Sequence, residues 1–175
     1  MRMMARFRDG GLELNEKKTQ IVYCQDDERR GNYPNRKFDF LGYTFQGRES
    51  RDRFGRYKVN FAPAVSDEAA KQIRQTMRQW RLHLHSDKTL EELARFVNPM
   101  VRGWINYYGK FHMTRLRFTF NCLNHRLARW AIRKHKRFER YHRGRAIHWL
   151  GRIAKHNPNL FAHWHWVSFR PAVGQ

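Results

Sequence analysis

Alternating apolar and polar positions in the first third of the chain predict β-structure. Residues 37–46 and 56–61 both carry alternating aromatic or apolar side chains, and a polar, glycine-containing segment, residues 47–55, joins them. This arrangement predicts an antiparallel hairpin. The β-branched run at residues 19–24 predicts another strand, and apolar residues at helical steps before Gly10 predict the end of a helix at the N-terminus.

After Pro63 the spacing of apolar positions changes to three and four residues, which predicts helices. Ser66 is a suitable cap for the first helix, and a capping box that starts at Thr89 predicts the second. The apolar positions that would face the core of these two helices are Ala69, Ile73, Met77, Trp80 and Leu84, followed by Leu90, Leu93, Ala94 and Val97.

Two further helices are expected in the last third of the chain. One begins at Thr114 and continues to a break at residues 143–144, and a short one covers residues 146–153 before Pro158. Residues 161–166 alternate with a period of two, so we expect an extended segment there.

A short helix from Asn98 to Phe111 shows two distinct faces. Asn98 can cap it, and Pro99 suits its first turn because the missing N–H would have no intrahelical partner there. Its buried face is predicted to hold Val101, Trp104, Ile105, Tyr108 and Phe111. Its polar face carries a row of hydrogen-bond donors: Arg102, Asn106 and Lys110.

Charge changes the picture from a plain helical domain to a polyanion-binding one. The chain has 36 Lys and Arg against 15 Asp and Glu, a net charge of +21. Residues 93–175 hold 17 of these basic side chains and a single acidic one, Glu139. The stripe on the helix that begins at Thr114 comprises Arg126, Arg129, Arg133, Lys136, Arg137 and Arg140. Arginines interleaved with aromatic rings suit phosphate contact and base stacking, so nucleic acid is the expected partner.

Other functional classes find less support. The two cysteines, Cys24 and Cys122, show no pairing rhythm, and the ten histidines show no metal-ligand spacing, so we expect a reducing compartment and no metal site. No apolar run approaches the ~18 residues of a membrane span, and no export signal is visible. The expected fold class is α+β, mainly α, with a β part at residues 1–63 and a helical part at residues 64–175.

Three motifs, in order, resemble group II intron-encoded reverse transcriptases. Asn-Pro-x-x-Arg-Gly-Trp-x-Asn-Tyr-Tyr at residues 98–108 is similar to their maturase-specific segment. Gly-Leu-Glu-Leu-Asn-Glu-Lys-Lys-Thr at residues 11–19 is similar to the end of their polymerase palm. Residues 38–45 resemble the hairpin that holds the primer end. The resemblance implies an end-of-palm remnant followed by a thumb and maturase domain.

The same resemblance implies that the polymerase site is missing from this chain. Polymerase chemistry needs clustered carboxylates that hold two metal ions. The family's aromatic-x-Asp-Asp turn would stand upstream of Gly11, where the sequence has none, and the pair Asp26-Asp27 follows in a charged loop. We expect no cofactor here, since the two Mg²⁺ ions belong to a complete polymerase, and no polymerisation by the chain alone.

Two segments match functional positions of the family. Lys18 matches a lysine near the incoming nucleotide, and without the metal site we expect a structural or phosphate-contacting role for it. Phe40, Leu41, Gly42 and Tyr43 match the primer-holding turn, where glycine allows close approach of a strand; an ordinary hairpin with an aromatic core face is an equally good interpretation.

Three functions remain open from the sequence. The first is binding and stabilisation of folded intron RNA for splicing, in a cytoplasmic ribonucleoprotein, through the donor row and the basic stripe. The second is one piece of a split or truncated RNA-directed DNA polymerase, which would bind primer-template and need a protein partner with the fingers and metal-binding aspartates. The third is nonspecific binding of nucleic acid.

Overall fold

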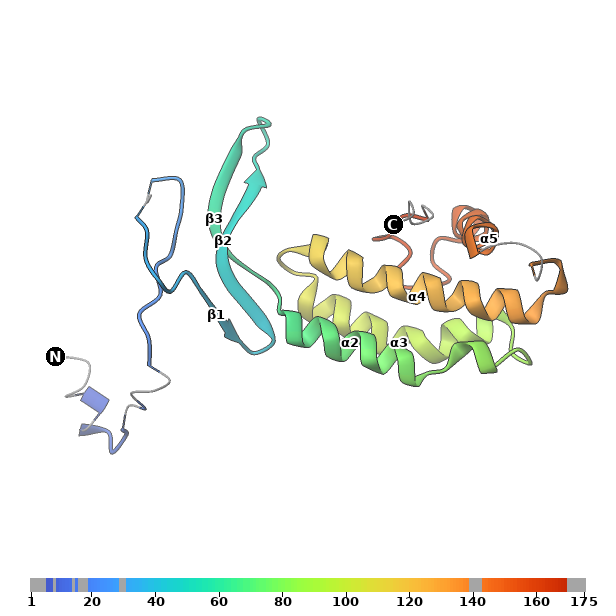
Figure 1. Cartoon of the computed structure of the whole chain (residues 1–175), viewed down its shortest axis with the longest axis horizontal. Coiled ribbons are helices and arrows are strands. Elements are labelled where there is room, and N and C mark those ends of the chain that lie inside the picture. The colour runs from blue at the N-terminus through green and yellow to red at the C-terminus, as the bar shows by residue number, and fades with distance from the viewer. Residues whose placement is uncertain are drawn as a thin grey trace. The chain divides into compact units, whose positions relative to one another are not determined.

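The fold class α+β, mainly α, is confirmed. The structure is a computed structural model that describes residues 6–7, 9–13, 15, 19–28, 31–138 and 143–169. Its elements (Figure 1) are β1 (Lys37–Phe40), β2 (Tyr43–Arg51), β3 (Tyr57–Val65), α2 (Asp67–Gln79), the 3-10 turn η1 (Leu82–Leu84), α3 (Leu90–Tyr108), α4 (Met113–Lys134), the 3-10 turn η2 (Lys136–Phe138) and α5 (Arg143–His156).

The chain divides into two compact units. The first comprises Met1–Phe40 and Phe45–Ala62, and the second comprises Leu41–Thr44 and Pro63–Gln175. The turn at Leu41–Thr44 thus belongs with the helices, although the sequence groups it with the β part.

The β part is a three-stranded sheet in the order β1-β2-β3, where a two-stranded hairpin is expected. Leu41 and Gly42 both have left-handed backbones, with φ of 49° and 78°, and this turn divides the first predicted run into β1 and β2. Phe38 stacks on Phe45 at a centroid distance of 4.8 Å and lies 6.2 Å from Phe61, so the predicted aromatic face is present.

The strand predicted at residues 19–24 is wrong. These residues have no ladder in the described part of the chain, and the side chain of Ile21 is 93% exposed. Tyr23 N–H donates to Asn35 O at 2.8 Å, and Asn35 Nδ2 donates to Ile21 O at 3.4 Å, but these two bonds to one residue make no strand pairing. A β-branched run forms a strand only where a neighbour supplies hydrogen bonds and packing.

Local capping chemistry correctly places the first two helices. Ser66 Oγ accepts from Ala69 N–H at 3.1 Å at the start of α2. Thr89 Oγ1 accepts from Glu92 N–H at 3.2 Å, and Glu92 Oε2 accepts from Thr89 N–H at 2.8 Å, so the predicted capping box begins α3. Each bond satisfies a backbone donor that the first turn leaves without a partner.

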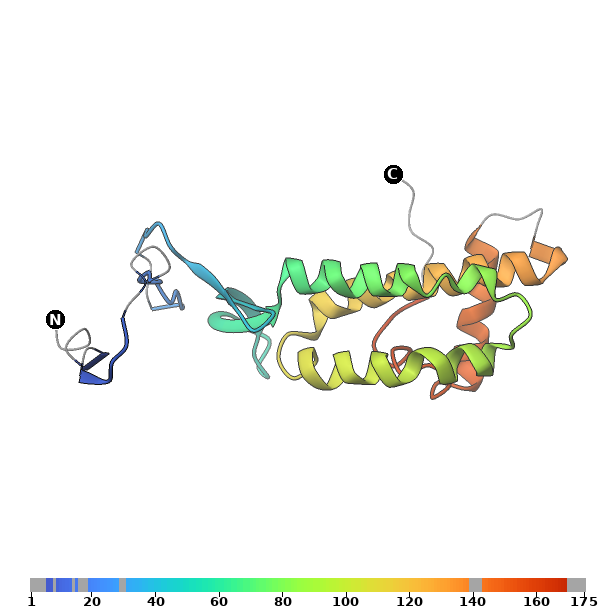
Figure 2. The ribbon, with the colours of Figure 1, turned by 90° about the horizontal axis from the view of Figure 1, so that it is seen from below.

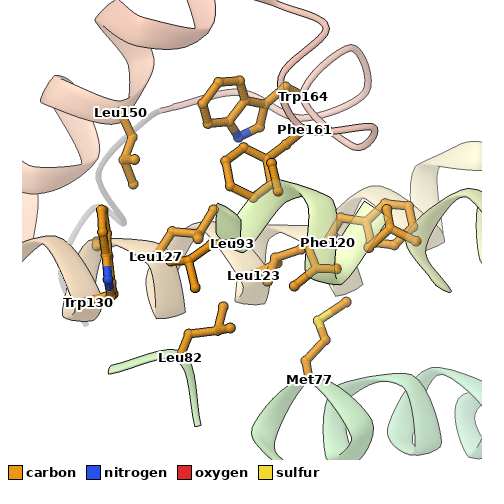
Figure 3. Packing of buried hydrophobic residues seen from close by; sticks show 14 of the residues in the cluster. Met77, Leu82, Leu93, Phe120, Leu123, Leu127, Trp130, Leu150, Phe161 and Trp164 are labelled. Atoms are coloured by element: carbon orange, nitrogen blue, oxygen red, sulfur yellow. The ribbon is translucent and has the colours of Figure 1, made fainter. Parts of the chain in front are cut away.

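The helices of the second unit enclose one hydrophobic core. α2, α3 and α4 run side by side, and α5 crosses near the far end of α4 (Figures 1 and 2). Met77 from α2, Leu93 from α3 and Leu127 from α4 meet at the centre, and Phe161 covers them from the C-terminal segment (Figure 3). Leu82 and Trp130 close the core near η1, where Trp130 Nε1 donates to His85 O at 2.8 Å.

The separate helix expected from Asn98 is wrong, because α3 runs without a break and holds Pro99 in its interior. Asn98 does not cap. Its Nδ2 donates to Leu160 O at 2.8 Å, and its Oδ1 accepts from Ala162 N–H at 2.9 Å. These long-range bonds join α3 to the C-terminal segment and keep Asn98 buried. Phe111, expected on the buried face, follows the helix and is 59% exposed.

Two expectations for the last third also need correction. α4 ends at Lys134, whose Nζ donates to Ser86 O at 3.0 Å and Lys88 O at 2.7 Å, and α5 already begins at Arg143. Residues 161–166 form turns, not an extended segment, with Trp164 N–H donating to Phe161 O at 3.0 Å. Burial does not follow the alternation, since the neighbours His163 and Trp164 are both buried.

Candidate nucleic-acid interface

Three elements bring arginines together along one side of α4. Because α4 packs against both α2 and η1, residues far apart in sequence become neighbours. Burial lowers the pKa of His83, and the positive charges of nearby arginines on α4 and at Arg81 lower it further. Burial also lowers the pKa of Arg126, and Arg78 and Arg129 add to that lowering. We define the arginine cluster as Arg78, Arg81, Arg126, Arg129 and Arg133.

The arginine cluster has no counter-ion in the described part of the chain. The ion pairs of the described residues involve cations outside the cluster, such as Arg115, which pairs with Asp67 at 3.2 Å. Arg78, Arg81, Arg129 and Arg133 are exposed, whereas Arg126 is half-buried and its Nε has no hydrogen-bond partner among the described residues. Guanidinium groups that repel one another and remain unpaired provide a favourable site for a polyanion.

The donor row of α3 lies on another side of the helices. Arg102 and Asn106 are exposed on α3, whereas Lys110 follows the end of the helix. Trp104 stacks at a centroid distance of 5.7 Å on Trp80, the residue that follows α2, so that side of α3 faces the end of α2. Arg102 follows Asn98 by one turn and therefore lies on the side of the C-terminal segment. The donor row and the arginine cluster are separate surfaces.

Two grooves add aromatic and basic side chains that the sequence analysis did not single out. One, of about 460 Å³, lies between α4 and the C-terminal turns and is lined by Thr114, Arg117, Phe118, Asn121, His165, Trp166, Val167 and Ser168. The other, of about 580 Å³, is lined by Phe138, Arg145, His148 and Arg152. Phe118 could have indicated the first groove, because it is an apolar residue on the polar side of α4. In the structure its side chain is 72% exposed.

Comparison with known families assigns the helical region. Residues 70–149 match the family model described as the group II intron, maturase-specific domain. Residues 70–149, which we call the matched region, are thus similar to a group II intron maturase-specific domain. This supports the resemblance drawn from residues 98–108 and, in general terms, a maturase-type role. Comparisons with curated proteins and with solved structures returned no match.

The matched region, residues 70–149, contains the whole arginine cluster, but the basic stripe predicted from one long helix is interrupted. Arg126, Arg129 and Arg133 lie on α4, whereas Lys136 and Arg137 lie in η2 beyond its end. Arg140 lies outside the described residues. The stripe prediction missed Arg78 and Arg81. These residues lie outside α4 in the sequence, and only the packing of α2 and η1 on α4 brings them close to it.

The turn that resembles the primer-holding segment precedes the matched region and is fixed to α3. Tyr107 Oη donates to Leu41 O at 3.0 Å, and Tyr43 Oη donates to Tyr107 O. A side chain at Gly42 would place its Cβ 2.7 Å from Tyr108 Oη, so glycine is required by both φ and contact. These contacts leave Leu41 67% exposed at the tip. Lys18, the other polymerase-like position, lies outside the described residues.

The described residues offer little to other chemistries. Among them, no three His, Cys, Asp or Glu side chains gather as metal ligands would. Of the helices in the described ranges, none combines the length and apolar character that crossing a bilayer requires. The cation-rich surfaces therefore remain the best candidate for the functional site.

Proposed function

We propose that this chain binds structured group II intron RNA through the arginine cluster and stabilises the RNA fold that splices, with the splicing chemistry residing in the RNA. The observation that carries this proposal is the convergence of five arginines from α2, from the residue before η1 and from α4. They have no counter-ion in the described residues and lie inside the region that matches the maturase-specific domain. Arginine suits this role because its planar fork matches phosphate oxygens.

A surface of this kind favours folded RNA over a simple strand. Backbone contacts carry no sequence information, and structured RNA is recognised mostly by shape, phosphates and 2′-hydroxyls. The donor row of α3 provides a second contact surface on another side of the helices. Two separated surfaces can both be used only by an RNA that folds around the protein, which favours an intron over bulk RNA.

The test measures binding of the full chain to folded intron RNA with bulk RNA as competitor at fixed salt. We expect intron RNA to be preferred. Replacing Arg126, Arg129 and Arg133 by Gln should lower the affinity at least tenfold and reduce the slope of log K against log salt by about 2 to 3. The matched control replaces three exposed cations outside the arginine cluster, Arg53, Lys58 and Lys155. An equal loss of affinity in both triple variants would contradict the proposal. Equal affinity for intron RNA and bulk RNA would instead support nonspecific binding of nucleic acid.

One observation favours the alternative of a split polymerase. The strand-like residues 19–24 lack a sheet partner in the described chain, and Ile21 is almost fully exposed. A partner protein that carries the fingers and the metal-binding aspartates would give this run a neighbouring strand. Primer extension after mixing the two pieces tests this alternative, and no extension by the mixture would dismiss it.

A further inference from the structure

The groove between α4 and the C-terminal turns has an aromatic ring on each of its two walls. Phe118 lies on α4, and Trp166 is held by its N–H bond to His163 O at 3.0 Å. The neighbouring side chains Phe161, His163 and Trp164 are buried, so the turn that carries Trp166 is anchored in the core. Phe118 is 72% exposed and Trp166 39% exposed, which leaves both rings accessible.

The polar groups of this groove are cationic or neutral. Arg117 is exposed at its edge, and no carboxylate is among its lining residues. Asn121 also lines the groove, and its Oδ1 has no hydrogen-bond partner among the described residues. An apolar protein segment placed here would desolvate the Arg117 guanidinium without compensation. A nucleotide suits this groove, because its flat base can stack on the aromatic rings and its phosphate can bind the Arg117 guanidinium.

α4 connects the groove to the arginine cluster. Phe118 and Arg126 are eight residues apart on one helix, which places them about 12 Å apart along its axis. A single strand of RNA can span that distance over a few nucleotides. Phosphates bound by the arginine cluster therefore bring the bases of the same strand close to Phe118.

We propose that this groove binds an unpaired RNA base, stacked on Phe118 or Trp166, while the adjacent backbone contacts Arg117 and the arginine cluster. The proposal rests on the RNA binding proposed above and adds a site that distinguishes unpaired bases from backbone. Aromatic rings that stack on bases tolerate any sequence, because every base has a π-face. The groove would thus select exposed, single-stranded nucleotides in the RNA.

The test compares two oligonucleotides of equal charge, a ten-nucleotide oligoadenylate and a ten-unit abasic strand, by fluorescence anisotropy with the full chain. We expect the oligoadenylate to bind about tenfold more tightly. Phe118→Leu and Trp166→Leu should each reduce that preference severalfold and leave abasic binding unchanged, and Phe118→Tyr should retain it. The control is Phe96→Leu, which removes another exposed ring, on α3. Thermal melts confirm that each variant is folded.

The outcomes separate this site from the proposed function. Equal binding of both strands by the wild-type chain, or a preference that survives both leucine variants, would overturn the base site and leave phosphate-driven RNA binding intact. Failure of the chain to bind either strand at low salt would overturn the base site, and failure to bind folded intron RNA as well would overturn both proposals. A polyglutamate peptide that bound as tightly as oligoadenylate, and depended equally on Phe118, would overturn the base site in favour of an acidic protein partner.

Discussion

At the scale of single residues, the most unusual group is the buried imidazole of His163. Trp164 Nε1 donates to Asn124 Oδ1 at 3.2 Å, and because an indole only donates, this Asn124 atom must be an oxygen. His163 Nε2 lies 2.8 Å from the same oxygen and therefore carries a proton. Its buried Nδ1 has no hydrogen-bond partner among the described residues, and burial disfavours the charged form, so the ring is neutral with Nδ1 unprotonated. Burial lowers the pKa of His163 to about 3.

This neutral ring predicts a stability that falls on acidification. The unfolded chain binds a proton near pH 6.5, whereas the folded chain binds it only near 3, so the free energy of unfolding declines as the pH falls between these values. The decline is about 1.4 kcal/mol per pH unit. Urea unfolding at pH 7 and 5 should show a loss of about 2 kcal/mol in the wild-type chain, beyond any loss in His163→Gln. Equal losses would show that His163 is not buried neutral.

At the scale of elements, Pro99 distinguishes one continuous α3 from two helices. In a continuous helix proline deprives Arg95 O of its partner, at a cost of about 3 kcal/mol relative to alanine, partly offset by the lower entropy of the unfolded chain. Pro99→Ala should therefore raise the free energy of unfolding by about 1–2 kcal/mol, measured by urea titration. A proline in the first turn after an Asn98 cap would give no gain. Met100→Ala, one position on, is the control and should change stability little.

Elements could be predicted from sequence where their signals are local. The cap at Ser66 and the capping box at Thr89 involve atoms within one helical turn, so their spacing in the sequence is sufficient. Asn98 has the composition of a cap, but its side chain is used by residues more than sixty positions later, which no local pattern reveals. Residues 19–24 show the opposite case, in which β propensity is present without a partner strand.

At the scale of the whole molecule, the sequence predicts the charge asymmetry but not the surface it produces. The spacing of Arg126, Arg129 and Arg133 indicates one face of a helix, as the structure shows. Arg78 and Arg81 come close to these residues because α4 packs against α2 and η1. The spacing of residues within one helix cannot predict that packing. The aromatic groove needs the C-terminal turns beside α4, a segment whose alternation predicted an extended form.

The same charges should make salt act in opposite directions on folding and on RNA binding. With a net charge of +21, the free protein is destabilised by its own repulsion, which added ions screen. Raising sodium chloride from 0.05 to 0.3 M should therefore raise the melting temperature of the free chain. Affinity for RNA should fall by about 10³-fold over that range, because each counterion released from the phosphates gains less entropy when the salt is more concentrated. The triple Gln variant of Arg126, Arg129 and Arg133 should melt higher than the wild type at low salt and respond less to salt in both measurements. A melting temperature that fell with salt would contradict the proposal that unpaired cations, which bind a polyanion, lower the stability of the free chain.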